Sequence, residues 1–182
     1  FAALHTDALA DVAHGATIAP SGALYQVRLD TYTVKARRIA DPSVAADWTS
    51  STWVTIATSG LPTPGVAIAS DPTLGTDSVY VFWVDVADGR TIRASVSTDG
   101  VTWTNEVVIV ENAAYQVRHV AGVLVDGEIH CVYILDQQSG APDEFLVSVE
   151  RVAAVWGSRT LQAVSRYNSN GLGLARITGD AN

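Results

Sequence analysis

The chain contains few residues of several kinds, and each shortage excludes a class of protein or site. None of its 182 residues is methionine and one, Cys131, is cysteine, so no disulfide can form within the chain. The apolar neighbours of Cys131 indicate a buried strand position rather than a reactive thiol. Because methionine is absent and the chain begins at Phe1, we expect it to be processed or to be a piece of a longer protein.

Positive charge is also scarce. Lys35 is the single lysine, and the formal net charge is -8. A nucleic-acid backbone would be repelled by such a chain, so no nucleic-acid partner is expected, and the acidity is interpreted as an aid to solubility. No apolar run approaches the roughly 18 residues of a membrane span, and no charged-then-apolar signal segment opens the chain. We therefore predict no membrane span.

Metal and cofactor motifs are missing too. The four histidines have no metal-ligand spacing, and no glycine-rich loop precedes a predicted helix. Asp99 has the chemistry to bind a cation, but a turn that uses the same oxygens is the preferred interpretation. The sequence predicts no metal site and no cofactor.

The remaining composition favours a folded all-β protein. Hydrophobic residues make up 48% and charged residues 16% of the chain, which argues against disorder. Short apolar runs alternate with turn signals such as Asp126-Gly127. Residues 1–13 have a weak pattern and are left as an unassigned lead-in or the end of a preceding unit.

The apolar runs repeat. Trp48, Trp103 and Trp156 lie about 50 residues apart, and four runs surround each of them. The repeat divides the chain into units at 14–60, 61–112 and 113–168, with the start of a further unit at 169–182. The predicted strands are 14–19, 23–29, 33–39 and 53–57; 65–69, 78–86, 91–96 and 106–110; and 117–125, 128–135, 145–149 and 159–164.

Four strands in about 50 residues is the repeat of a β-propeller blade, a small antiparallel sheet that buries its faces against its neighbours. Residues 79–84 are apolar at every position, as expected for a strand buried on both faces. The predicted fold is therefore all-β: consecutive four-stranded antiparallel blades of a propeller. Three blades make an incomplete ring, because closed rings take four to eight.

The connection between the predicted strands 91–96 and 106–110 has strong turn chemistry. It reads Ser97-Thr98-Asp99-Gly100-Val101-Thr102-Trp103. The Asp99 carboxylate can accept hydrogen bonds from amides further along the turn, and Gly100 can adopt positive φ. We predict a hairpin tied by the Ser97 and Thr102 hydroxyls and covered by Trp103.

The order Ser-x-Asp-Gly-x-Thr-Trp resembles the Asp-box, or BNR repeat, of sialidase-like β-propellers, where it joins the third and fourth strands of a blade. This copy is one residue shorter than the commonest form. The resemblance gives a structural role to Ser97, Asp99, Gly100, Thr102 and Trp103. The corresponding segments of the other units, 41–48 and 150–156, are more degenerate and keep mainly the tryptophan.

The resemblance also implies where chemistry would lie. Sialidase-like enzymes use three arginines that grip a carboxylate, a Tyr with a Glu, and an Asp acid, all close to the propeller axis. On predicted inner strands this chain offers Arg118, His119 and Arg176, which we take as candidate binding residues for an acidic sugar. Two arginines are not a triad, and solvated strand residues are the competing interpretation. No catalytic set is predicted.

Two further possibilities concern aromatic residues and loops. Tyr115 and Glu111 resemble a nucleophile and its base, although a core or loop aromatic is the favoured interpretation. Trp53, Trp83 and Tyr133 could stack on sugars if exposed, but core packing is favoured for them. Loops 70–77 and 111–116 are expected to offer binding surfaces on one rim.

These observations lead to two functional hypotheses. The first is a non-catalytic recognition or structural module of a larger extracellular or virion-surface assembly, such as a virus tail or fibre or a bacterial extracellular protein, with a glycan or protein receptor as its partner. Further blades from the same or other chains would complete its ring. The second is a fragment of a sialidase-like glycoside hydrolase. Both rest on the resemblance, because a fold alone does not define a function.

Overall fold

The computed structural model describes residues 13–62, 65–138 and 143–166, which form three antiparallel sheets and one short helix. The first sheet contains β1 (Ala13–Ile18), β2 (Leu24–Asp30), β3 (Thr33–Ile39) and β4 (Val54–Ala57). The second contains β5 (Val66–Ser70), β6 (Val79–Val84), β7 (Thr91–Ser97) and β8 (Thr104–Val110). The third contains β9 (Tyr115–Val125), β10 (Glu128–Gln137), β11 (Asp143–Val152), β12 (Val155–Trp156) and β13 (Thr160–Arg166).

Each sheet is a meander in which consecutive strands pair in chain order. The first two sheets have four strands each. In the third, both the short β12 and β13 pair with β11, at different parts of its length. The prediction of an all-β chain made of consecutive antiparallel sheets is therefore confirmed. Each predicted strand is found, with its ends displaced by no more than a few residues.

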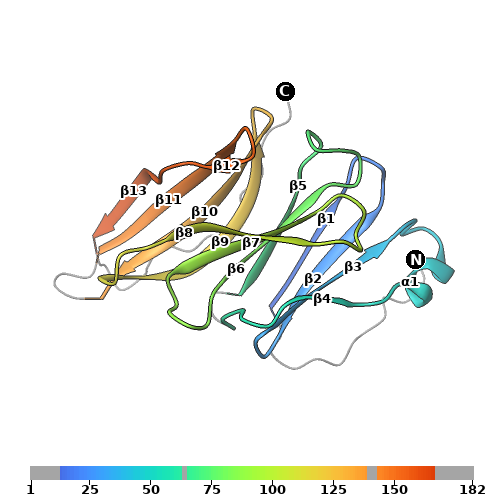
Figure 1. The fold of residues 1–182 in the computed structure, drawn as a ribbon, viewed down its shortest axis with the longest axis horizontal. Coiled ribbons are helices and arrows are strands. Elements are labelled where there is room, and N and C mark those ends of the chain that lie inside the picture. The colour runs from blue at the N-terminus through green and yellow to red at the C-terminus, as the bar shows by residue number, and fades with distance from the viewer. Residues whose placement is uncertain (1–12, 63–64, 139–142, 167–182) are drawn as a thin grey trace.

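The three sheets lie side by side, and their first strands are neighbours (Figure 1). β1 contacts β5, and β5 contacts β9. Small residues permit this approach: a Cβ added to Gly15 would lie 3.2 Å from the Ile68 side chain, and one added to Gly122 would lie 2.9 Å from Ala69 Cβ. Backbones can come this close where no side chain separates them.

The middle sheet is buried on both faces, and β6 shows this best. Val81 and Trp83 belong to the apolar cluster shared with the first sheet, whereas Tyr80 and Phe82 belong to the cluster shared with the third. All six residues of β6 are fully buried. The predicted burial of this strand on both faces is confirmed, and it explains why polar residues do not alternate along it.

The tryptophans that mark the repeat all lie in the connection after the third strand of a sheet. Trp103 packs on the apolar clusters shared with the first sheet. Trp156 meets Tyr80 and Phe82 of the second sheet edge-on, at centroid distances of 6.1 and 5.8 Å. Each of these two side chains therefore covers part of the preceding sheet.

The sequence did not predict α1 (Ala45–Ser50). The second half of the segment 41–48, compared above with the Asp-box, enters this helix because Ala45 and Ala46 are strong helix formers and no glycine is present for a tight turn. The Trp48 indole donates a hydrogen bond to the Pro42 carbonyl, at 2.8 Å. Of the Asp-box features expected in this segment, only the position of Trp48 after the third strand is found.

Substituting Gly122 should reveal how closely the second and third sheets approach. A Cβ at this position would lie 2.5 Å from a ring carbon of Phe82. We expect Gly122→Ala to lower the free energy of unfolding by about 1 to 3 kcal/mol, measured by urea denaturation. The control is Gly157→Ala, whose Cβ would lie 3.4 Å from its nearest neighbour, the Glu150 carbonyl oxygen. Equal effects of the two substitutions would contradict this packing.

Candidate functional site

The β7–β8 turn is a compact hydrogen-bonded unit. Asp99 Oδ1 accepts bonds from the backbone N–H groups of Val101 at 2.8 Å and Thr102 at 2.7 Å. Ser97 Oγ donates to the same oxygen at 3.1 Å and accepts the Gly100 N–H at 2.8 Å. The predicted roles of Ser97 and Asp99 as internal ties of the turn are confirmed.

These bonds make the Asp99 carboxyl a stronger acid than that of an ordinary aspartate. The amides of Thr102 and Val101 stabilise the carboxylate and lower its pKa to about 2, with smaller contributions from the Thr102 and Ser97 side chains. The side chain is therefore charged at any physiological pH. The bonds from Ser97 Oγ and from the Val101 and Thr102 N–H groups all end on one oxygen, Oδ1.

The turn also docks on the first sheet. Gly100 has φ 78°, and a Cβ there would lie 2.7 Å from Arg38 Cδ and 3.0 Å from a Tyr25 ring carbon. Asp77, from the β5–β6 loop, accepts a bond from Arg38 Nη2 at 2.9 Å and one from Ser21 Oγ at 2.5 Å. The turn and the β5–β6 loop together hold the second sheet to the first.

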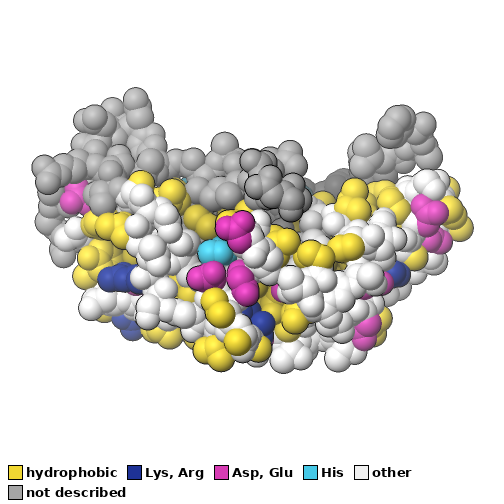
Figure 2. Space-filling model, turned by 90° about the horizontal axis from the view of Figure 1, so that it is seen from above, with side chains coloured by type: hydrophobic (Ala, Val, Ile, Leu, Met, Phe, Trp, Pro, Cys, Tyr) yellow, Lys and Arg dark blue, Asp and Glu magenta, His cyan; other side chains and the backbone are white. Residues whose placement is uncertain are grey.

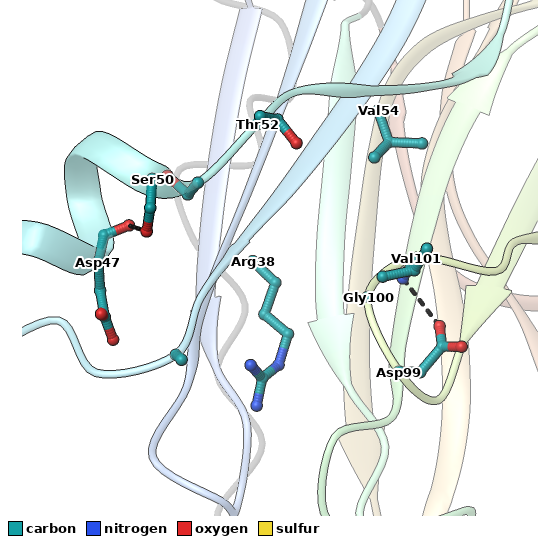
Figure 3. Close-up of a pocket in the computed structure, with 10 residues that line it drawn as sticks. Arg38, Asp47, Ser50, Thr52, Val54, Asp99, Gly100 and Val101 are labelled. Atoms are coloured by element: carbon teal, nitrogen blue, oxygen red, sulfur yellow. Dashed lines mark hydrogen bonds between the residues drawn. The ribbon is translucent and has the colours of Figure 1, made fainter.

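A groove opens where this turn faces the α1 segment (Figure 3). Its volume is about 300 Å³. One side is formed by α1 and the residues that lead into β4, and the other by the β7–β8 turn; Arg38 lies between them (Figure 3). The lining residues are Arg38, Ala40, Asp47, Ser50, Ser51, Thr52, Val54, Asp99, Gly100 and Val101.

The predicted binding residues are not assembled into a carboxylate clamp. Arg118 lies on β9 with its side chain half exposed, and it forms an ion pair with Asp136 of the neighbouring β10. His119 follows it and is exposed. Arg176 lies outside the described residues. Because Asp136 already neutralises Arg118, that guanidinium is poorly placed to bind another carboxylate.

A tyrosine–glutamate pair does exist, but with a different tyrosine from the one considered in the sequence. The Tyr133 hydroxyl donates to Glu111 Oε1 at 2.5 Å, and Arg159 Nη1 donates to Oε2 at 2.7 Å. The Arg159 guanidinium also lies over the Tyr115 ring in a cation–π contact, with its Cζ 5.8 Å from the ring centroid. The pairing was missed because Tyr133 is distant in sequence and only the packing of β10 against the second sheet brings it to Glu111.

Burial gives this pair a structural character. Tyr133 is 0% and Glu111 4% exposed. Burial, helped by the adjacent Glu111 charge, raises the pKa of the Tyr133 phenol far above its ordinary range. A phenol that is buried and stays protonated cannot attack a bound substrate. The pair instead holds the second and third sheets together.

A second polar contact joins the same two sheets at their other end. Arg151 donates to both Glu106 oxygens, at 3.1 and 2.8 Å, and Trp156 Nε1 donates to Glu106 Oε2 at 2.7 Å. Such a bidentate pair has a defined geometry and is stronger than a neutral hydrogen bond. Buried apolar packing and two polar contacts thus fix the third sheet on the second.

The loops expected to share a rim lie at opposite ends of the sheets. Loop 70–77 lies beside Ser21 and Arg38 at the end that carries the β7–β8 turn. Loop 111–116 lies at the other end, where the Glu111 N–H donates to the Arg90 carbonyl at 3.2 Å. That prediction was wrong because successive connections of a meander alternate between the two ends of a sheet.

The end that carries the β7–β8 turn, called here the β7–β8 end, is acidic and partly apolar. Figure 2, which shows the molecule from above the view of Figure 1, has hydrophobic and acidic side chains interspersed on its surface. Five accessible carboxylates at this end form no ion pair within the described residues: Asp41, Asp47, Asp99, Asp126 and Glu128. The exposed aliphatic side chains here are Ile18, Val44, Leu74, Val101, Val125, Val152 and Val155.

The described residues offer no further chemical centre. Among them no three His, Cys, Asp or Glu side chains are grouped so as to hold a metal ion. Within the same ranges no helix has the length and apolar character needed to cross a membrane. Trp83 and Tyr133 are buried, as expected for core residues, and Trp53 is half-buried with Arg28 4.3 Å from its ring.

The Asp99 bonds can be tested by substitution. We expect Asp99→Ala to lower the free energy of unfolding by about 1 to 2 kcal/mol, because several turn hydrogen bonds are lost. The effect should depend on pH. Since the folded pKa lies below the ordinary value of 3.8, the charged side chain stabilises the fold above about pH 4 and loses that contribution as the pH falls towards 2.

Urea denaturation of the wild type and the variant at several pH values measures this dependence. The difference in unfolding free energy should be constant near neutrality and should shrink on acidification below about pH 4. The turn would not have the described bonds if the difference grew on acidification or were absent at neutral pH.

Two tyrosines allow a matched test of the buried pair. Tyr133→Phe removes the hydroxyl that bonds Glu111, and we expect a loss of about 1 to 2 kcal/mol in the free energy of unfolding. Tyr115 makes its contacts through its ring, with Phe145 and Arg159, so Tyr115→Phe should change stability by less than about 0.5 kcal/mol. The reverse order would show that Glu111 is paired with Tyr115 instead.

No protein-family model matches the chain. No curated protein matches it either. The functional argument therefore rests on the residues and their arrangement.

Proposed function

We propose that the chain is a segment of a sialidase-like β-propeller that acts as a non-catalytic recognition or structural module of a larger surface assembly. The observation that carries the proposal is the β7–β8 turn, which joins the third and fourth strands of a sheet through the hydrogen bonds of Ser97 and Asp99. An Asp-box occupies this same connection in a propeller blade. Trp103 covers the preceding sheet from that position.

The order of the sheets supports the same fold. Each sheet is a meander of consecutive strands, and the first strands β1, β5 and β9 are neighbours. In a propeller the first strand of each blade lies closest to the axis, and each blade is buried by the next. Further blades, from the same or other chains, would then complete the ring.

A recognition or structural role is preferred to catalysis because of how the charged groups are used. Arg118 is paired with Asp136, and the Tyr133–Glu111 pair is buried. The Tyr133–Glu111 pair is the one observation that favours the alternative, a fragment of a sialidase-like hydrolase. Its position between two sheets, away from solvent, counts against that role.

The location follows from the resemblance. Asp-box propellers occur in virus tails and fibres and in bacterial extracellular proteins, so an extracellular or virion-surface position is proposed here. The exposed aliphatic and acidic side chains of the β7–β8 end would be available to a glycan or protein receptor.

Turnover of a fluorogenic sialoside tests the non-catalytic part. The purified chain should release no more fluorophore than buffer over a range of pH, with a sialidase as the positive control. Turnover that disappears in Arg118→Ala would replace the proposal with the hydrolase. An experimental structure of the natural protein in which β1, β5 and β9 did not surround a common axis would end the propeller assignment.

A further inference from the structure

We propose that the groove between α1 and the β7–β8 turn binds a neutral, hydroxyl-rich sugar residue of a glycan. This inference rests on the proposed recognition function and gives it a location. The groove lies at the β7–β8 end and is built from two sheets, so it exists only where the first and second sheets meet.

The size and walls of the groove suit a single sugar ring. Its volume of about 300 Å³ is at the lower limit of small-molecule sites. Thr52, just before β4, and Val54, the first residue of β4, lie on the wall opposite the β7–β8 turn (Figure 3). Val101, whose side chain is 70% exposed, lines the opposite wall. The two valines offer apolar contact for the C–H groups of a sugar.

The groove also has hydrogen-bonding capacity that the fold does not use. The bonds from Ser97 Oγ and from the Val101 and Thr102 N–H groups to Asp99 all end on Oδ1, and the bond from the Asp41 N–H to Asp47 at 2.8 Å ends on Oδ2. Each carboxylate keeps acceptor positions for a ligand, because an ionised carboxylate has about four. Ser51 Oγ donates to the Trp48 carbonyl at 3.0 Å, which leaves its lone pairs available. A sugar hydroxyl can both donate and accept, so it can bond to carboxylates and to such hydroxyls.

The charges in the groove select against anionic ligands. Asp47 and Asp99 lie on opposite walls and repel an acidic sugar such as a sialic acid. Arg38 lies between them, but its charge is balanced by Asp77 at 2.9 Å, so the groove is negative. A neutral polyol avoids the cost of placing an anion beside like charges, and its hydroxyls can donate to both carboxylates.

Arg38 is committed to the fold. Its Nη2 donates to Asp77, and its Nε is buried, out of reach of a ligand in the groove. The capacity of the groove to bond a sugar therefore lies with the Asp47 and Asp99 carboxylates and the Ser51 and Thr52 hydroxyls.

Saturation-transfer difference NMR on the whole chain tests the proposal. The probes are a panel of neutral methyl glycosides, N-acetylneuraminic acid and n-butylammonium. We expect at least one neutral glycoside to bind with a dissociation constant on the order of 1 mM. N-acetylneuraminic acid should bind more weakly because Asp47 and Asp99 repel its carboxylate, and n-butylammonium should bind more weakly because it has no hydroxyls to bond to the groove. Preference for either charged probe would overturn the proposal.

Two variants with matched controls locate the site. Thr52→Val removes a groove hydroxyl without changing side-chain size, and Asp47→Asn removes a charge but keeps an acceptor for the Asp41 N–H. We expect each to weaken neutral-glycoside binding about three- to tenfold. Thr104→Val and Asp126→Asn are the corresponding changes outside the groove, and their binding should stay within about twofold. Thermal melting checks that all four variants are folded.

The outcomes separate this inference from the function on which it rests. If the wild type binds a neutral glycoside and the groove variants bind it as well as the controls do, the groove is not the site, although glycan recognition stands. If no neutral glycoside binds, the inference fails, and the non-catalytic role is judged separately by sialoside turnover.

Discussion

The structure depends on burying both faces of the middle sheet. β6 has no polar side chain that could face water, so the sheet is stable only with a neighbour on each side. Trp83 faces the first sheet, and Phe82 faces the third. Small residues on the neighbouring first strands, Gly15 and Gly122, permit the close contact that this burial requires. A single sheet of this kind would expose too much apolar surface to fold alone.

Polar contacts set the relative position of the sheets. Apolar packing is non-directional, whereas Asp77 with Arg38, Glu106 with Arg151, and Glu111 with Tyr133 have defined geometries. They lie at the edges of the two interfaces. The carboxylates of Asp77, Glu106 and Glu111 thus align the sheets. The accessible carboxylates of the β7–β8 end have no such role and can contact a ligand. The groove between α1 and the β7–β8 turn is a consequence of the same alignment.

Local patterns were sufficient for most of the fold. The strand positions followed from apolar runs between turns, and the β7–β8 turn followed from Asp99 and Gly100, because its bonds join residues only two or three apart. α1 was missed because six residues hold little periodic signal. The candidate site was predicted poorly: Arg118 was named without its partner Asp136, and the bond between Tyr133 and Glu111 was not foreseen.

By itself the sequence determined the class of the fold, the order of the main strands and the chemistry of the Asp99 turn, because these depend on side-chain alternation and on contacts between near neighbours in the chain. Only the tertiary structure decided which charged groups are neutralised and which face solvent. Tyr133 and Glu111 are brought together by the packing of one sheet on another, and so are the walls of the groove beside Asp47. Such juxtapositions depend on the register and spacing of whole sheets, and no local pattern encodes them.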